Sequence, residues 1–357
     1  MLFLVAYLRN KAYNKGSMDN WILKGVRNLV NGGGEGKEIS PTQVKVKVSH
    51  LLVSDFDAML FNGDVAAEYP KTIGRFAVGI ITEVGEKCYG VKKGDRVYLE
   101  SAKPCGVCLS CKSGKRENCE DIKIAGRDYD GFMRDFVVCE YSDVSILPEA
   151  VDNLQALCIE MVGIAENIYD KLKLSAGKRV AVVGSDCLGN LIAQVLQYHK
   201  VIPIVIDNNP DNLELAKKCG VYYTFPADEE LIENVMDATS GDLCDAAVYT
   251  ANSKLPVSLT SQLVGKSKSV ILSGFASAHT TLDACDILEK DLTLFGVTNA
   301  ANYTDSVINM MLHGAVNVNF FDKEIINEFD PISILTERCN GLRSANKSKL
   351  TVLKMMF

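Results

Sequence analysis

The sequence lacks the features that would point to a nucleic acid or a membrane as its partner. No stretch is rich in lysine or arginine, and the formal net charge is −7, whereas a general nucleic-acid-binding protein needs a basic face. No apolar run is long enough to cross a bilayer. Internal repeats and low-complexity segments are also missing. The negative charge favours solubility and argues against a general nucleic-acid-binding protein.

The sequence also lacks the marks of a secreted protein. Its start, MLFLVAYL, is apolar but has neither a basic leader nor a small-residue cleavage site, so we expect a first β-strand here and no signal peptide. Of the 12 cysteines, four are clustered and the others are scattered through apolar surroundings such as VVCEY. This distribution is typical of a cytoplasmic protein with one metal cluster and buried thiols, and not of a disulfide scaffold.

The composition is that of an ordinary globular chain. Hydrophobic residues make up 47% of the 357 residues and charged residues 23%, and the length predicts two domains, or at most three. Up to about residue 150, apolar and alternating runs predict a β-rich domain whose strands are separated by glycine, proline and charged turns. The expected strands are 44–53, 77–85, 95–100 and 135–140, and residues 31–42 read as a loop.

The pattern changes near residue 150, where short apolar strands begin to alternate with helices. KRVAVVG (178–184) predicts a strand, 188–199 a helix with apolar residues at helical spacing, and 202–207 another strand. Asn209 and Pro210 favour a helix start, and Gly220 is a natural end for that helix. Further strands are expected at 246–250, 269–275, 292–297 and, at the end of the chain, 349–355. Strand–helix–strand units of this kind predict an α/β fold with a parallel sheet.

A cysteine cluster, CGVCLSCKSGKRENC, indicates a metal site. Its cysteines follow the pattern C-x2-C-x2-C-x7-C, and they are Cys105, Cys108, Cys111 and Cys119. Four thiolates on one short loop can close a tetrahedral shell around zinc, and a shell without an open position is structural, not catalytic. An iron–sulfur cluster is the alternative occupant.

The turn G-S-D-C-L-G resembles the dinucleotide fingerprint G-x-G-x-x-G, between a strand and a helix. Gly184 would supply the tight turn and Gly189 the close packing of helix on strand, with Leu188 as the first apolar residue of the helix. The middle glycine is replaced by Asp186, which adds bulk and negative charge where phosphates would meet the helix N-terminus. Asp207 ends the next strand, where an acidic residue binds ribose hydroxyls and favours NAD over NADP. A Rossmann-type domain that no longer binds a cofactor is the alternative.

Together these motifs resemble the zinc-containing medium-chain dehydrogenase/reductase family, over nearly the whole chain and in family order. GDRV (94–97) matches a family motif outright, and the cysteine lobe follows it. VKVKVSHLLVSDFD resembles the strand that ends in the family's C-G-S-D, and IGRFAVGIITEVG its G-H-E-x-x-G-x-V-x-x-V-G. DGFMRDFV (130–137) is similar to the glycine-aromatic segment, and CIEMVGIAENIYDKL (158–172) to the E-P-L helix.

The resemblance implies a domain plan. Residues 1–154 would form a GroES-like catalytic domain with the structural zinc lobe at 100–120. Residues 155–297 would form the Rossmann NAD(P)-binding domain, and residues 298–357 would return to the catalytic domain. The resemblance also implies a homo-oligomer, a dimer or a tetramer.

The departures from the family lie at the catalytic zinc. The family's cysteine ligand aligns with Leu52, its histidine with Arg75, and the glutamate beside that histidine with Phe76. Only Glu160, at the E-P-L position, could still bind a metal. His50 lies two residues before Leu52 and is interpreted as a structural side chain. The alignment therefore predicts one structural zinc and no catalytic zinc, because one carboxylate does not make a tetrahedral site.

Two hypotheses concern the role of Arg75. In the first, Arg75 fills the vacated site, pairs with Glu160 or Asp55, and stabilises negative charge on a substrate oxygen, which would suit an anionic substrate. In the second, Arg75 only neutralises Glu160 in a collapsed, apolar pocket. Ser54 and Asp55 remain from C-G-S-D, and the resemblance gives Ser54 the role of passing on the substrate's proton; a hydrogen-bonded turn residue is the alternative.

Two functions follow. The first is an NAD(P)-dependent oxidoreductase, with NAD as the expected form, that acts on an alcohol or carbonyl without catalytic zinc. The second is a non-catalytic descendant that acts as a binding or scaffold protein. Fold alone does not decide between them, because function depends on the site.

Overall fold

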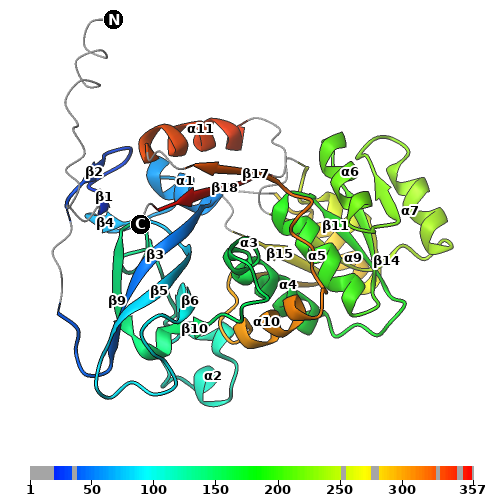
Figure 1. Cartoon of the computed structure of the whole chain (residues 1–357). Coiled ribbons are helices and arrows are strands. Elements are labelled where there is room, and N and C mark those ends of the chain that lie inside the picture. The colour runs from blue at the N-terminus through cyan, green and yellow to red at the C-terminus, as the bar shows by residue number, and fades with distance from the viewer. Residues whose placement is uncertain are drawn as a thin grey trace, which may run out of the picture.

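The structure is a computed structural model that describes residues 20–33, 38–250, 255–274, 281–326, 330–343 and 349–355. The strand expected at the start of the chain and residues 34–37 of the expected loop lie outside the described residues. Figure 1 shows a sheet-rich part built mainly from the first half of the chain, beside a part in which helices surround a second sheet.

The first part is built on a seven-stranded sheet. Its order is β10-β6-β5-β3-β18-β17, and β9 also pairs with β3. In β3, VKVKV alternates between a buried valine and a partly exposed lysine, which is the pattern of a strand with one face on the core. The strands are β3 (Gln43–Val53), β5 (Phe76–Val84), β6 (Arg96–Leu99), β9 (Phe136–Glu140), β10 (Val144–Ile146), β17 (Asp322–Ile326) and β18 (Lys349–Lys354).

The end of the chain returns to this first sheet. β18 pairs antiparallel with β3, and β17 lies parallel to β18. Figure 1 shows both strands next to β3 and beneath the helix α11 (Pro331–Arg343). The boundaries at residues 154 and 297 remain predictions.

The second part is a six-stranded parallel sheet in the order β13-β12-β11-β14-β15-β16. Numbered along the chain, this order is 3-2-1-4-5-6, the Rossmann arrangement, in which ligands bind beyond the carboxyl ends of the strands. The central strands β11 and β12 are nearly continuous apolar runs, as expected where helices cover both faces. The strands are β11 (Arg179–Val183), β12 (Ile202–Ile206), β13 (Tyr223–Phe225), β14 (Cys244–Thr250), β15 (Val264–Ser273) and β16 (Thr293–Val297).

Helices and short strands complete the fold. The helices are α1 (Asp55–Asn62), α2 (Leu109–Lys112), α3 (Asn153–Leu157), α4 (Ile159–Leu172), α5 (Cys187–Tyr198), α6 (Pro210–Lys218), α7 (Leu231–Thr239), α8 (Leu259–Gln262), α9 (Ala284–Lys290) and α10 (Thr304–Leu312), with 3₁₀ turns η1 (Arg116–Asn118) and η2 (Tyr141–Asp143). The short strands are β1 (Trp21–Leu23), β2 (Leu29–Asn31), β4 (Lys71–Thr72), β7 (Ala102–Lys103) and β8 (Lys123–Ile124). Within the described ranges, none of the helices combines the length and the apolar character that crossing a membrane requires.

Candidate active site, cofactor site and metal lobe

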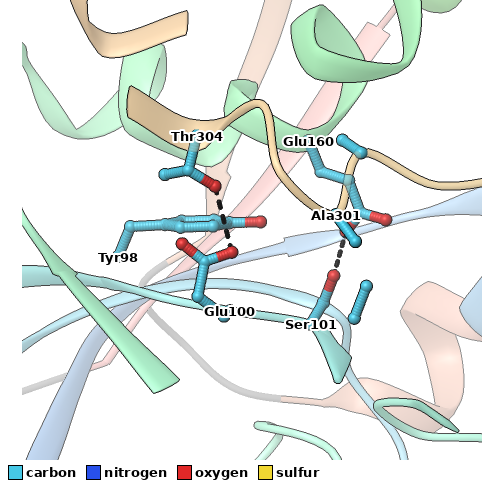
Figure 2. A pocket seen from close by; sticks show the side chains of 8 residues that line it. Tyr98, Glu100, Ser101, Glu160, Ala301 and Thr304 are labelled. Carbon is cyan, nitrogen blue, oxygen red and sulfur yellow. Dashed lines mark hydrogen bonds between the residues drawn. The ribbon is translucent and has the colours of Figure 1, made fainter. Parts of the chain in front are cut away.

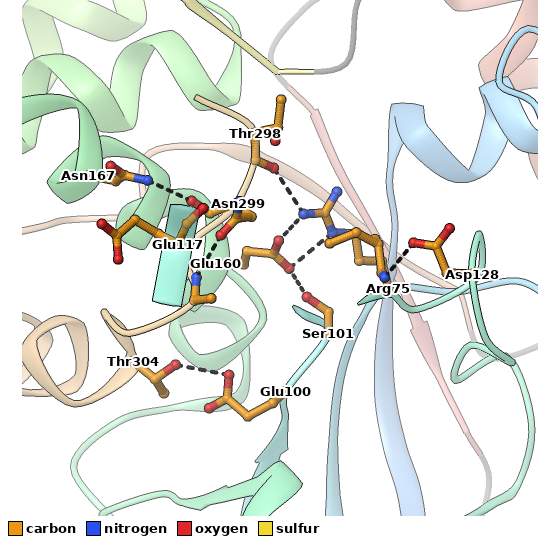
Figure 3. A network of polar contacts seen from close by, with 12 residues as sticks. Arg75, Glu100, Ser101, Glu117, Asp128, Glu160, Asn167, Thr298, Asn299 and Thr304 are labelled. Carbon is orange, nitrogen blue, oxygen red and sulfur yellow. Dashed lines mark hydrogen bonds and ion pairs between the residues drawn. The ribbon is translucent and has the colours of Figure 1, made fainter. Parts of the chain in front are cut away.

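Arg75 lies at the entry to β5, and its side chain is buried at 1% exposure. Gly74 precedes it with φ 101°, and a Cβ at Gly74 would lie 2.7 Å from the backbone nitrogen of Met133, so this turn requires glycine. The guanidinium donates through Nε to Oε2 of Glu160 at 3.1 Å and through Nη2 to Oε1 of the same carboxylate. Nη2 also donates to the carbonyl oxygen of Thr298 at 3.2 Å (Figure 3).

The surroundings of Arg75 compensate a buried charge. The guanidinium carbon lies 5.2 Å from the ring centre of Phe56 and 5.5 Å from that of Phe76, within the range of cation–π attraction. The hydroxyl of Ser101 donates to Oε2 of Glu160, which is itself only 3% exposed. The pair therefore has the geometry and the additional hydrogen bonds that a buried ion pair needs.

The four residues that the sequence alignment predicts at the family's zinc site lie together at this point. Leu52 lies opposite Phe76 in the pairing of β3 with β5. Arg75 directly precedes Phe76 in the chain, and Glu160 forms hydrogen bonds with Arg75. Leucine, phenylalanine and a cationic guanidinium offer no ligand atom, so the residues present do not fit a catalytic zinc. In the described parts of the chain, the four lobe cysteines are the one group of three or more candidate ligands close enough to hold an ion.

His50 takes no part in the pair. Its Nδ1 lies 3.1 Å from Oγ of Ser49 and 3.2 Å from Nδ2 of Asn153. Burial, and then the charge of Lys354, lowers the pKa of His50. These contacts describe a structural side chain.

Ser54 begins α1 as its N-cap residue and shares a capping box with Asp57. The hydroxyl of Ser54 donates to Oδ2 of Asp57 at 2.6 Å, and Asp57 also accepts from the backbone nitrogens of Ser54 at 2.8 Å and Gly74 at 2.9 Å. Burial raises the pKa of Asp57. Asp55 forms an ion pair with Arg338 at 2.8 Å. Sequence reasoning missed Asp57, although the spacing S-x-x-D signals a capping box.

A small polar cavity adjoins the Arg75–Glu160 pair (Figure 2). Its volume of about 10 Å³ leaves room for about one water molecule. Glu100 accepts hydrogen bonds from Ser145 at 2.7 Å and from Thr304 at 3.0 Å, and burial raises the pKa of Glu100 to about 7. The lining residues are Tyr98, Glu100, Ser101, Ala102, Glu160, Ala300, Ala301 and Thr304. Nothing in the sequence around Glu100 signals this site, because its partners come from distant segments.

The cysteine cluster forms a compact lobe below the first sheet, with α2 inside it (Figure 1). The sulfur atoms of Cys105, Cys108, Cys111 and Cys119 all lie within 4.8 Å of one another. Backbone nitrogens point at sulfur: that of Cys105 lies 3.2 Å from Sγ of Cys119, and that of Cys108 lies 3.4 Å from Sγ of Cys105. A four-sulfur donor set of this kind fits a structural zinc ion.

The fingerprint turn joins β11 to α5. Gly184 has φ 97°, and a Cβ at Gly189 would overlap the carbonyl oxygen of Gly184, so both positions require glycine. Leu188 packs against the core beneath the turn. Asp186 is the N-cap residue of α5, and its Oδ1 accepts from the backbone nitrogen of Gly189 at 3.0 Å.

Asp207 lies at the end of β12 and binds the same turn. Its carboxylate accepts from the backbone nitrogens of Ser185 at 2.7 Å and Asn209 at 2.8 Å, and from Nδ2 of Asn212 at 3.1 Å. The backbone geometry thus fits a dinucleotide, while Asp186 places a carboxylate near the phosphate position.

Comparisons with known proteins agree with this architecture. A family model described as the alcohol dehydrogenase GroES-like domain matches residues 40–149, and one described as zinc-binding dehydrogenase matches residues 187–313. The chain is 25% identical to a 2-dehydro-3-deoxy-L-galactonate 5-dehydrogenase of Pseudoalteromonas atlantica, over 84% of this chain and 88% of that protein. It is 28% identical to an L-threonine 3-dehydrogenase of Pyrococcus horikoshii, over 72% and 76%.

Solved structures show the same fold. An alcohol dehydrogenase (RspB) of Escherichia coli in complex with NADH superposes with a TM-score of 0.83 at 23% identity, covering 95% of this chain and all of that one. A protein of Sinorhizobium meliloti described as a zinc-binding dehydrogenase and bound to NADP superposes with a TM-score of 0.82 at 19% identity, covering 96% and 100%.

The predicted fold, a GroES-like β domain with a Rossmann domain, is therefore confirmed. The predicted resemblance is confirmed as well: the chain belongs to the zinc-type medium-chain alcohol dehydrogenase-like family.

Proposed function

We propose that this chain is an NAD(P)-dependent oxidoreductase that moves a hydride between nicotinamide and an alcohol or carbonyl substrate without a catalytic zinc. The observation that carries the proposal is the β11–α5 unit, in which Gly184 and Gly189 make the tight turn of the dinucleotide fingerprint. Asp207 binds that turn from the end of β12, where ribose would lie. A 2′-phosphate there would meet this carboxylate, which supports NAD over NADP.

The substrate oxygen would lie beside Arg75 and Glu160. In reduction, the carbonyl carbon takes a hydride from the nicotinamide, the oxygen takes one proton, and the cofactor leaves oxidised; alcohol oxidation is the reverse. A fixed cation in a site that excludes water can stabilise negative charge on that oxygen. Ser54 is the proposed proton-passing residue, and its bond to Asp57 gives the proton a buried carboxylate as its neighbour.

A second candidate function is supported by Asp186 and by the closed Arg75–Glu160 pair. The carboxylate of Asp186 already accepts the amide of Gly189, and both side chains of the pair are 3% exposed or less. A zinc-stapled binding or scaffold protein without turnover would have these two features.

The remaining proposals concern the assembly. The lobe would hold one structural zinc per chain, and zinc is favoured over an iron–sulfur cluster because the matching family is a zinc-binding one. A homo-oligomer, an anionic substrate and a cytoplasmic location remain proposals from the sequence and the resemblance.

Nucleotide binding separates the two functions. Titrating the full chain with NADH and NADPH should raise its melting temperature, NADH more strongly, since a ligand at a hundred times its Kd stabilises a protein by about 2.7 kcal/mol. If neither nucleotide changes the melting temperature, the oxidoreductase proposal fails and the scaffold is favoured.

A further inference from the structure

Residues 298–304 run from the end of β16 to the first residue of α10, and they touch the metal lobe on one side and the Arg75–Glu160 pair on the other (Figure 3). Asn299 is buried at 5% exposure, and its Nδ2 donates to the carbonyl oxygen of Glu117 at 3.1 Å. Nδ2 of Asn302 donates to the carbonyl oxygen of Gly114 at 2.7 Å. Both acceptors lie in the loop between Cys111 and Cys119.

The other contacts of this segment lead to the candidate active site. The carbonyl oxygen of Thr298 accepts from Arg75 at 3.2 Å, and the hydroxyl of Thr304 donates to Glu100 at 3.0 Å. Asn167 on α4 donates to the carbonyl oxygen of Asn299 at 3.1 Å, and Oδ1 of Asn299 accepts from the backbone nitrogen of Ala301 at 3.1 Å. Asn299 therefore holds the segment's own turn as well as the lobe.

The lobe has little apolar core of its own. Residues 112–116 are exposed, and only Cys111 and Cys119 among its cysteines are buried. A loop of this kind takes its fixed shape from the metal that its thiolates bind, because metal binding and local folding are coupled. We therefore expect the carbonyl groups of Gly114 and Glu117 to accept hydrogen bonds from the two asparagines only while the lobe is folded around its metal.

We propose that the metal-loaded lobe fixes residues 298–304 through Asn299 and Asn302, and thereby places the Thr298 carbonyl that Arg75 binds. Asn299 and Asn302 are thus positioning residues that couple the metal lobe to the Arg75–Glu160 pair. The backbone of Asn302 supports a built contact, since its φ of 100° is uncommon outside glycine and asparagine is among the few residues that tolerate positive φ. The coupling goes beyond the proposed function, because it needs a metal in the lobe but no dinucleotide.

Coupling is reciprocal, so the two asparagine contacts also strengthen metal binding. A hydrogen bond of ordinary strength corresponds to roughly a five-fold change in an equilibrium constant. Replacing both asparagines by aspartate keeps their shape and their acceptor oxygens but removes the donors. The metal affinity of Asn299→Asp/Asn302→Asp should therefore fall roughly twenty-fold or more.

The test is hydrogen exchange on the full chain, loaded with zinc and then stripped by a chelator. We expect removal of zinc to speed exchange in residues 298–304 as well as in the lobe, and the double variant to exchange fast in 298–304 even when loaded. Lys171→Met is the matched control: it removes the 3.1 Å contact of α4 with Asn118 in the lobe but leaves the segment untouched.

Two results would overturn the proposal. One is unchanged exchange in 298–304 when the lobe has lost its zinc. The other, which does not depend on how the stripped protein folds, is a double variant that competes with a chelator for zinc as strongly as the wild type does. The control separates this coupling from a general weakening of the lobe, because Lys171→Met should leave exchange in 298–304 unchanged.

Discussion

Arg75 is a buried charged residue at the position where the sequence predicts the family's histidine ligand. Its partners include three residues from distant segments: Glu160 on α4, the carbonyl of Thr298 after β16, and the ring of Phe56 on α1. These partners fix the position of the charge, and removing one of them lowers the free energy of unfolding strongly because a buried charge is left without its partner.

Removing one member of the pair should destabilise the protein more than removing both. Glu160→Gln leaves the guanidinium buried without its counter-charge, at a cost of about 3–5 kcal/mol, whereas Arg75→Met with Glu160→Gln should cost much less. Urea unfolding of the two single variants and the double variant measures this difference. Single variants as stable as the wild type would show that the pair does not form in solution.

Glu100 should make stability depend on pH. Its pKa in the folded chain is about 7, against an ordinary value of 4.5, with burial as the first cause and Glu160 and Asp305 as further ones. Because the pKa of Glu100 is raised in the folded chain, folding favours the protonated carboxyl. The resulting contribution to the free energy of unfolding is fully present below about pH 4.5, and it is lost as pH rises to about 7, at about 1.4 kcal/mol per pH unit. The neutral variant Glu100→Gln lacks this loss, so its stability relative to the wild type should rise across that range. Parallel unfolding curves at all pH values would contradict this assignment.

At the scale of elements, the turn before α5 separates the two candidate functions, because Asp186 lies where the dinucleotide phosphates would bind. Asp186 caps the helix, and a cap replaced by glycine costs only a few tenths of a kcal/mol. Asp186→Gly restores the fingerprint and removes a negative charge, so NADH should bind roughly ten-fold tighter at little cost in stability. Fluorescence titration with NADH measures this change. An unchanged affinity would mean that the carboxylate points away from the phosphates.

Some of these elements could be predicted from the sequence, and others could not. The strands β3, β11 and β12 were predicted from the alternation in β3 and from the short apolar runs of β11 and β12. In these strands the local order of apolar and polar residues determines which side chains are buried. The strand β17 was not predicted, since EII in a polar stretch carries no clear period. Likewise, Thr298 and Arg75 are 223 residues apart, and no local signal predicts their contact.

At the scale of the whole molecule, the two parts share a buried apolar cluster that includes Phe76 and Val162, and polar contacts cross the junction beside it. Arg75–Glu160, Glu100–Thr304 and Asn302–Gly114 each join the first part to α4 or to residues 298–304. The position that the sequence predicts for the family's catalytic metal lies in this junction, and it holds an ion pair and apolar side chains. We propose that the chain keeps the structural metal and has lost the catalytic one.

A zinc count per chain separates a protein with one structural ion from one that also holds a catalytic ion. Zinc measured by mass spectrometry on the purified full chain should equal one ion per chain, and should fall to none in Cys111→Ser/Cys119→Ser, because the lobe supplies the only complete ligand set among the described residues. Arg75→His restores one ligand and should not raise the count, since Leu52 still offers none. Two zinc ions in the wild-type chain, or one that persists in the lobe variant, would show a zinc site outside the lobe and overturn the proposal.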